Sequence, residues 1–118
     1  TQRAAWRQVG YAAHLSVRAK CLFHIATVVE ELYVVSSVGH WIPNDDGKIE
    51  PIGGGDPAVD AAYFETYVFD IARFDGHGFP HIGKLKDSNR YRDAHEAEKG
   101  HVALCEKVQK MRNRRKKK

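Results

Sequence analysis

The chain has few cysteines and no long hydrophobic run, and both shortages limit what it can be. Only Cys21 and Cys105 occur among its 118 residues, too few for the disulfide framework of a small secreted domain. No apolar stretch approaches the roughly 20 residues that span a bilayer, which argues against a membrane segment. The chain opens Thr1-Gln2-Arg3 with no apolar signal-peptide core. We therefore expect a cytoplasmic protein with reduced, buried thiols and no membrane contact.

Common catalytic and nucleotide-binding motifs are also missing. The sequence has no nucleophile elbow, P-loop or Rossmann fingerprint. The run Gly53-Gly54-Gly55 lacks the Lys-Ser/Thr pair that a P-loop needs, so we interpret it as a flexible turn. These absences favour a non-enzymatic protein.

The basic residues are unevenly distributed, and the net charge of +4 hides this. Residues 107–118 carry eight cations and no acid, while the other 106 residues carry 11 basic and 15 acidic residues, a net charge of −4. The eight cations are Lys107, Lys110, Arg112, Arg114, Arg115, Lys116, Lys117 and Lys118. Such asymmetry predicts a partner with negative charge, either nucleic acid or an acidic protein surface. No aromatic residue is interleaved with these cations, so base stacking is not predicted.

Three segments have the pattern of strands. Alternation of apolar and polar residues predicts a half-buried strand at about Cys21–Val29, with a helical stripe as the alternative. Residues 32–38 are rich in β-branched side chains and predict a second strand, joined to the first by a tight turn at Glu30-Glu31. Residues 61–74 give the clearest strand signal.

Two segments are predicted to be helical. Residues 3–14 have a helix-favouring composition, and Asp93 with Glu96 three residues later forms a capping box that starts a C-terminal helix. The apolar face of that helix repeats at spacings of three and four, through Ala97, His101, Leu104, Cys105, Val108 and Met111. Gly100 within it predicts a close approach of the helix to the sheet.

The connections are expected to be irregular. Residues 39–60 form a long loop with a small hairpin at Asp46-Gly47, and residues 76–89 form a connection that can include one short edge strand. The resulting prediction is a single α+β domain over residues 1–111 followed by a basic tail, residues 112–118. Its sheet is a meander of three or four antiparallel strands, with the C-terminal helix packed on one face and a short N-terminal helix beside it.

Three stretches resemble a group of small uncharacterised phage-encoded proteins. The first stretch is residues 24–27 followed by residues 34–38, which is similar to the V-S-T-V strand of that group. Residues 64–69 are similar to F-E-T-M-V-F, and residues 90–101 to R-Y-x-T-x-x-E-A-x-x-G-H. The stretches occur in the same order and touch about 30 residues. The Asp of the group's G-x-D-H is absent after Gly39-His40, Asp93 replaces its Thr, and the basic tail is not one of its features. The resemblance implies a fold and a phage origin, and a phage-encoded protein would be located in the host cytoplasm. It implies no catalytic activity or ligand.

One candidate metal site combines two cysteines with two histidines. Cys21 and His24 are three residues apart, and His101 and Cys105 are four apart, so two helical segments would offer zinc a tetrahedral set. The strand predicted from residue 21 instead turns Cys21 and His24 to opposite faces. The alternative is that both cysteines pack as small apolar residues.

Loop histidines give a second candidate metal site. His77 and His81 flank a Gly-Phe-Pro segment close to Asp75, and imidazole is the commonest metal ligand. With His40 they would serve a small metal-dependent hydrolase-like enzyme. The alternative is that they are solvent-exposed.

Glu65 and His101 are a third candidate, because a strand carboxylate could orient a helix imidazole as a general base. The alternative, which we favour, is a buried hydrogen bond between helix and sheet. Three functions therefore compete: a non-enzymatic accessory protein that binds nucleic acid or an acidic partner through its basic C-terminus, the hydrolase-like enzyme, and a virion or assembly component. The cofactor and the oligomeric state are left open.

Overall fold

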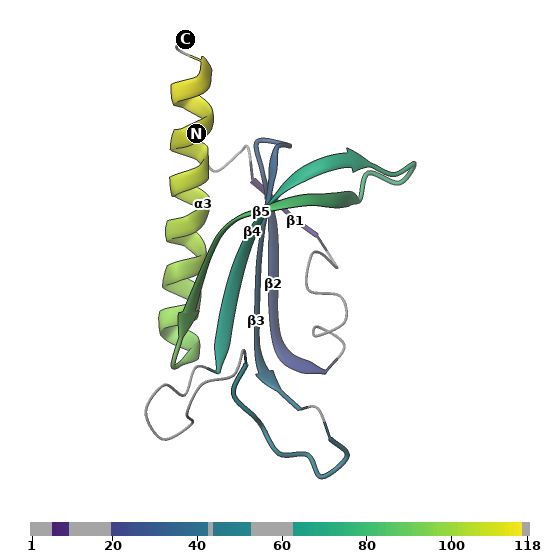
Figure 1. The fold of residues 1–118 in the computed structure, drawn as a ribbon, viewed down its shortest axis with the longest axis vertical. Coiled ribbons are helices and arrows are strands. Elements are labelled where there is room, and N and C mark those ends of the chain that lie inside the picture. Colours follow the sequence, from purple (N-terminus) through teal and green to yellow (C-terminus); the bar gives the residue numbers. More distant parts are fainter. Residues whose placement is uncertain (1–5, 10–19, 43, 53–62, 117–118) are drawn as a thin grey trace.

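The fold is an antiparallel sheet with one long helix across one face (Figure 1). The computed structural model describes residues 6–9, 20–42, 44–52 and 63–116, with side chains described as far as residue 111. Its elements are β1 (Trp6–Gln8), β2 (Cys21–Val29), β3 (Tyr33–Trp41), β4 (Phe64–Phe74), β5 (Pro80–Tyr91) and α3 (Ala94–Lys116). The five strands form a meander in the order β1-β2-β3-β4-β5, and every neighbouring pair is antiparallel. Helix α3 contacts β2, β3, β4 and β5.

The predicted α+β meander is confirmed, but its two outer parts were predicted wrongly. The sheet has five strands rather than three or four. Where an N-terminal helix was predicted, residues 6–8 form β1, which pairs with β2 so that Trp6 lies opposite Val29 and Gln8 opposite Thr27. Pairing with the edge of β2 outweighs a weak helix propensity. Most of the remaining predicted helix lies outside the described residues.

The second error concerns β5, which spans most of the segment predicted to be irregular. Most of its side chains are exposed, and Gly83 together with two lysines gives it a loop-like composition. Backbone pairing with β4 holds this polar edge strand in place. The predicted Gly-rich turn at residues 53–55 lies outside the described residues.

The tight turn predicted between β2 and β3 is confirmed, and its backbone is unusual. Glu30 and Glu31 both have a φ of 54°, and Leu32 N–H donates to Val29 O at 3.0 Å. Side chains with a Cβ rarely adopt this left-handed region, at a cost of about 1 kcal/mol each. Gln109 Nε2 donates to Glu30 at 3.1 Å, and Arg7 Nε donates to Glu31 at 2.8 Å. Contacts from the helix and from β1 therefore hold the strained turn.

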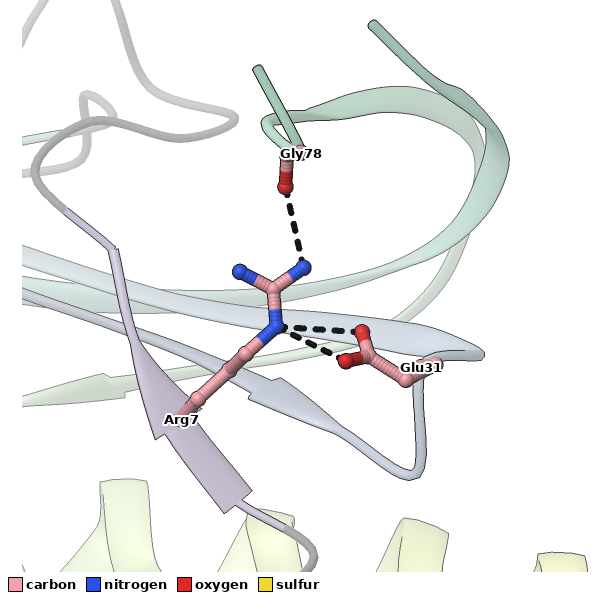
Figure 2. Close-up of polar contacts among 3 residues, drawn as sticks. All are labelled: Arg7, Glu31 and Gly78. Atoms are coloured by element: carbon pink, nitrogen blue, oxygen red, sulfur yellow. Dashed lines mark hydrogen bonds and ion pairs between the residues drawn. The ribbon is translucent and has the colours of Figure 1, made fainter. Parts of the chain in front are cut away.

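Arg7 also connects the β2–β3 turn to the turn between β4 and β5. Its Nη2 donates to Gly78 O at 3.0 Å, while its Nε contacts both oxygens of Glu31 (Figure 2). The guanidinium lies 5.4 Å from the centroid of the Phe74 ring. One side chain on the short β1 thus joins both turns at this end of the sheet.

The main hydrophobic core lies between the sheet and α3. Val29, Tyr33, Val35 and Val68 pack against Leu104, Cys105 and Val108, with Trp6 alongside. The predicted helix face is buried through Val108, whereas Met111 is 37 % exposed. The last turns of the helix extend past the described strands (Figure 1). Among the described residues, no helix is both long and apolar enough to cross a bilayer.

Two glycines allow close contacts in this core. A Cβ on Gly100 would overlap the ring of Tyr91, which confirms the predicted close approach of helix and sheet. A Cβ on Gly39 would overlap the ring of Phe64, which is fully buried across the neighbouring strand. At both positions an added Cβ would displace the neighbouring aromatic ring.

Candidate functional site

A chain of buried polar side chains surrounds His101 under the helix. His101 Nδ1 lies 2.7 Å from Ser37 Oγ on β3, and Nε2 lies 2.8 Å from Thr27 Oγ1 on β2. Ser37 Oγ lies 2.6 Å from Thr66 Oγ1 on β4, and Thr27 donates to Gln8 Oε1 on β1 at 3.2 Å. The chain therefore crosses four strands and is centred on one helix residue.

The proton positions in this chain follow from its ends. Thr27 has a single hydroxyl proton and donates it to Gln8, so it must accept the bond from His101 Nε2–H. A neutral imidazole then has an acceptor at Nδ1, which takes the proton of Ser37. Thr66 in turn donates to Ser37. In this arrangement His101 is neutral and carries its proton on Nε2.

Burial keeps the titratable groups of this region neutral. It lowers the pKa of His101 to about 4, with a smaller contribution from the charge of His24. Burial also raises the pKa of Cys105 to about 12, partly opposed by a hydrogen bond with Thr27. The low pKa makes the imidazole of His101 a weak base, and the high pKa keeps Cys105 a thiol at pH 7, which is a poor nucleophile.

The Ser37–His101 contact has the distance of a nucleophile and its base, but its surroundings do not suit catalysis. Ser37 is 0 % exposed, it contacts Nδ1 rather than the Nε2 that faces the serine in catalytic triads, and the other ring nitrogen contacts a threonine hydroxyl instead of a carboxylate. We interpret the chain as a structural link between helix and sheet. The sequence analysis selected His101 but missed its hydrogen-bond partners. The sequence feature that could have identified them is the presence of Thr and Ser at strand positions that face the helix.

Glu65 does not meet His101. Its neighbour Thr66 faces the helix, so strand alternation places Glu65 on the opposite face of β4, between Val38 and Arg90. Glu65 is 4 % exposed and has no hydrogen-bond partner at Oε1. A hydrogen bond with Glu65 is the main cause that raises the pKa of Tyr67. Neither the general-base pair nor the buried Glu65–His101 hydrogen bond that we favoured from the sequence is formed, because the two residues lie on opposite faces of the sheet.

The four predicted zinc ligands are likewise not assembled into a site, although β2 and α3 are in contact. Cys21 and His24 lie on a strand, where an odd spacing turns their side chains to opposite faces. Both ring nitrogens of His101 are hydrogen-bonded, to Thr27 and to Ser37, and Cys105 is packed in the apolar core. In the part of the chain that the structure describes, no group of three or more His, Cys, Asp or Glu is arranged to hold a metal ion.

The loop histidines form no metal-binding group among the described residues either. His77 and His81 are both exposed on the β4–β5 hairpin. His40 lies on β3 with its ring 4.7 Å from that of Phe64. Asp75, close to His77, accepts backbone hydrogen bonds from Phe79 and His77 that lower its pKa. This arrangement is a hairpin turn.

The basic end of α3 is the remaining candidate. Gln109 is the last buried residue of the helix among those with described side chains; Lys110 and Met111 are exposed, and the helical backbone continues to Lys116. Of the predicted cations, Lys107 forms an ion pair of 2.6 Å with Asp87 on β5. The hydrogen bond from Lys107 is the main cause that lowers the pKa of Asp87.

Searches against protein-family models, curated proteins and solved structures find no match for this chain.

Proposed function

We propose that the protein is a non-enzymatic accessory protein whose basic C-terminal helix binds the phosphate backbone of nucleic acid. The observation that supports this proposal is the placement of the cations. Seven of the nine residues 110–118 are Lys or Arg, and they begin where the helix leaves the folded body. The rest of the chain is slightly acidic, so this end is a separate site of positive charge.

The composition of the segment favours a phosphate backbone over a protein groove. A helix that docks in a protein groove needs apolar anchors at spacings of three and four, and Met111 is the only apolar residue after Val108. Phosphates need only nearby cations, because binding releases condensed counterions. If each of the seven cations contacted one phosphate, log K would fall with log[salt] with a slope of about −6.

The test is fluorescence anisotropy with a labelled 30-base-pair DNA duplex in KCl from 50 to 400 mM. The variant replaces Arg112, Arg114 and Arg115 by Gln. Three lost contacts should make the slope shallower by about 3 and weaken binding at 0.1 M salt by two to three orders of magnitude. A matched control replaces the exposed Lys48, Arg73 and Lys99 by Gln, which changes the net charge equally.

The outcomes separate the alternatives. The proposal requires a steep salt dependence that the arginine variant loses and the control retains. Equal weakening by both variants would mean that net charge alone drives binding, and the proposed site would be wrong. Binding of poly-glutamate but not of the duplex would show that the partner is an acidic protein instead.

A further inference from the structure

The cation nearest the folded body is already engaged by the protein itself. Lys107 Nζ lies 2.6 Å from Asp87 Oδ2, although the lysine side chain is 60 % exposed. Exposed ion pairs of this kind contribute little to stability. The fold therefore depends little on the pair, and its main consequence is that Asp87 occupies the cation nearest the folded body.

Lys107 begins a stripe of cations along one side of α3. Lys110 follows three residues later and Arg114 four residues after that, spacings that bring helix positions to the same side. At about 1.5 Å per residue the stripe is about 10 Å long, a length over which one strand of a duplex carries about three phosphates. The same side of the helix faces β5, because Gly100 contacts Tyr91 there and Lys107 contacts Asp87.

We infer that Asp87 is an intramolecular competitor for phosphate, which keeps Lys107 out of the nucleic-acid contact and so limits affinity at the body end of the stripe. This inference rests on the proposed function and adds an internal restraint on the same site. Asp87 occupies Lys107 in the free protein, and its carboxylate would repel a phosphate placed beside Lys110. Replacing Asp87 by Asn removes both effects while it preserves the shape of the side chain.

The experiment is the same duplex titration with a double-mutant cycle. Asp87→Asn should add one phosphate contact, which steepens the slope by about 0.9 and tightens binding about eightfold at 0.1 M salt and about twofold at 0.4 M. Lys107→Gln alone should change the slope little, because Asp87 already holds that lysine. The double variant should lose the added contact and return to the slope of the unmodified protein.

Asp45→Asn is the matched control, since Asp45 is exposed and lies on a different loop. A similar gain from Asp45→Asn, or a gain from Asp87→Asn that persists when Lys107 is also replaced, would overturn the inference and leave only a general charge effect. Circular dichroism establishes that each variant is folded. The proposed function is judged separately by the arginine variant, so a failure of the Asp87 inference is distinguishable from a failure of the proposed function.

Discussion

Acidification from pH 7 to pH 4 is expected to destabilise this protein through His101. In the unfolded chain His101 takes up a proton near pH 6.5, whereas in the folded protein burial lowers its pKa to about 4. Between these values the unfolded state binds more protons, so stability falls as the pH falls. The shift corresponds to a loss of about 3 kcal/mol at pH 4, and nearly all of the stabilisation is present above pH 6.5.

The hydrogen-bond chain gives the structural reason for this loss. Protonation would place a second N–H on the imidazole, which Ser37 can accept only by reversing its other hydrogen bond so that it donates to Thr66. The imidazolium would then be buried with the neutral hydroxyl groups of Thr27 and Ser37 as its partners. Burying a charge without an ionic partner costs free energy, so the protonated form is disfavoured in the folded protein.

Urea denaturation at pH 7, 5.5 and 4 measures the effect, with His101→Gln as the comparison. Gln retains a donor and an acceptor but does not titrate, so the difference in pH dependence between the two proteins isolates His101 from the other six histidines. The unmodified protein should lose about 3 kcal/mol more than the variant between pH 7 and pH 4. Equal losses, or an NMR titration of His101 near pH 6.5, would refute the reasoning.

Three further substitutions test the packing. Gly39→Ala should destabilise by about 3 kcal/mol or more, because the new methyl group overlaps the buried ring of Phe64; the additional change Phe64→Leu should recover part of this loss in urea denaturation. Gly100→Ala should cost less, since the overlapped ring lies at the sheet edge and Ala favours the helix by about 1 kcal/mol; a cost equal to that of Gly39→Ala would contradict this. Ser37→Ala should cost about 1–3 kcal/mol by leaving the His101 acceptor unsatisfied, with denaturation at pH 7 as the measurement.

Short-range sequence patterns predicted the elements that depend mainly on neighbouring residues. The β2–β3 hairpin follows from two β-rich segments around a charged pair, and the start of α3 follows from its cap, in which Asp93 accepts from Glu96 N–H at 2.8 Å. Strand β1 is three residues long and depends on the edge of β2, so no local pattern identifies it. Strand β5 is polar because most of its side chains are exposed, so it lacks the apolar alternation of a buried strand. It forms because its backbone pairs with β4, which a local sequence pattern does not show.

Among the candidate sites, too, one follows from the local sequence and another depends on tertiary contacts. The basic segment is a property of composition and was found directly. The partners of His101 depend on the register of several strands, because one residue of slip would turn Thr27 and Ser37 away from the helix. The resemblance to phage-encoded proteins and the assembly function both stay predictions.

The most direct measurement of the central claim is an NMR map of the protein with a short DNA duplex at 50 mM and then 400 mM KCl. The account predicts that amide shifts concentrate in residues 110–118 at low salt and largely disappear at high salt. Shifts centred on the folded body, with the C-terminal amides unchanged, would contradict it.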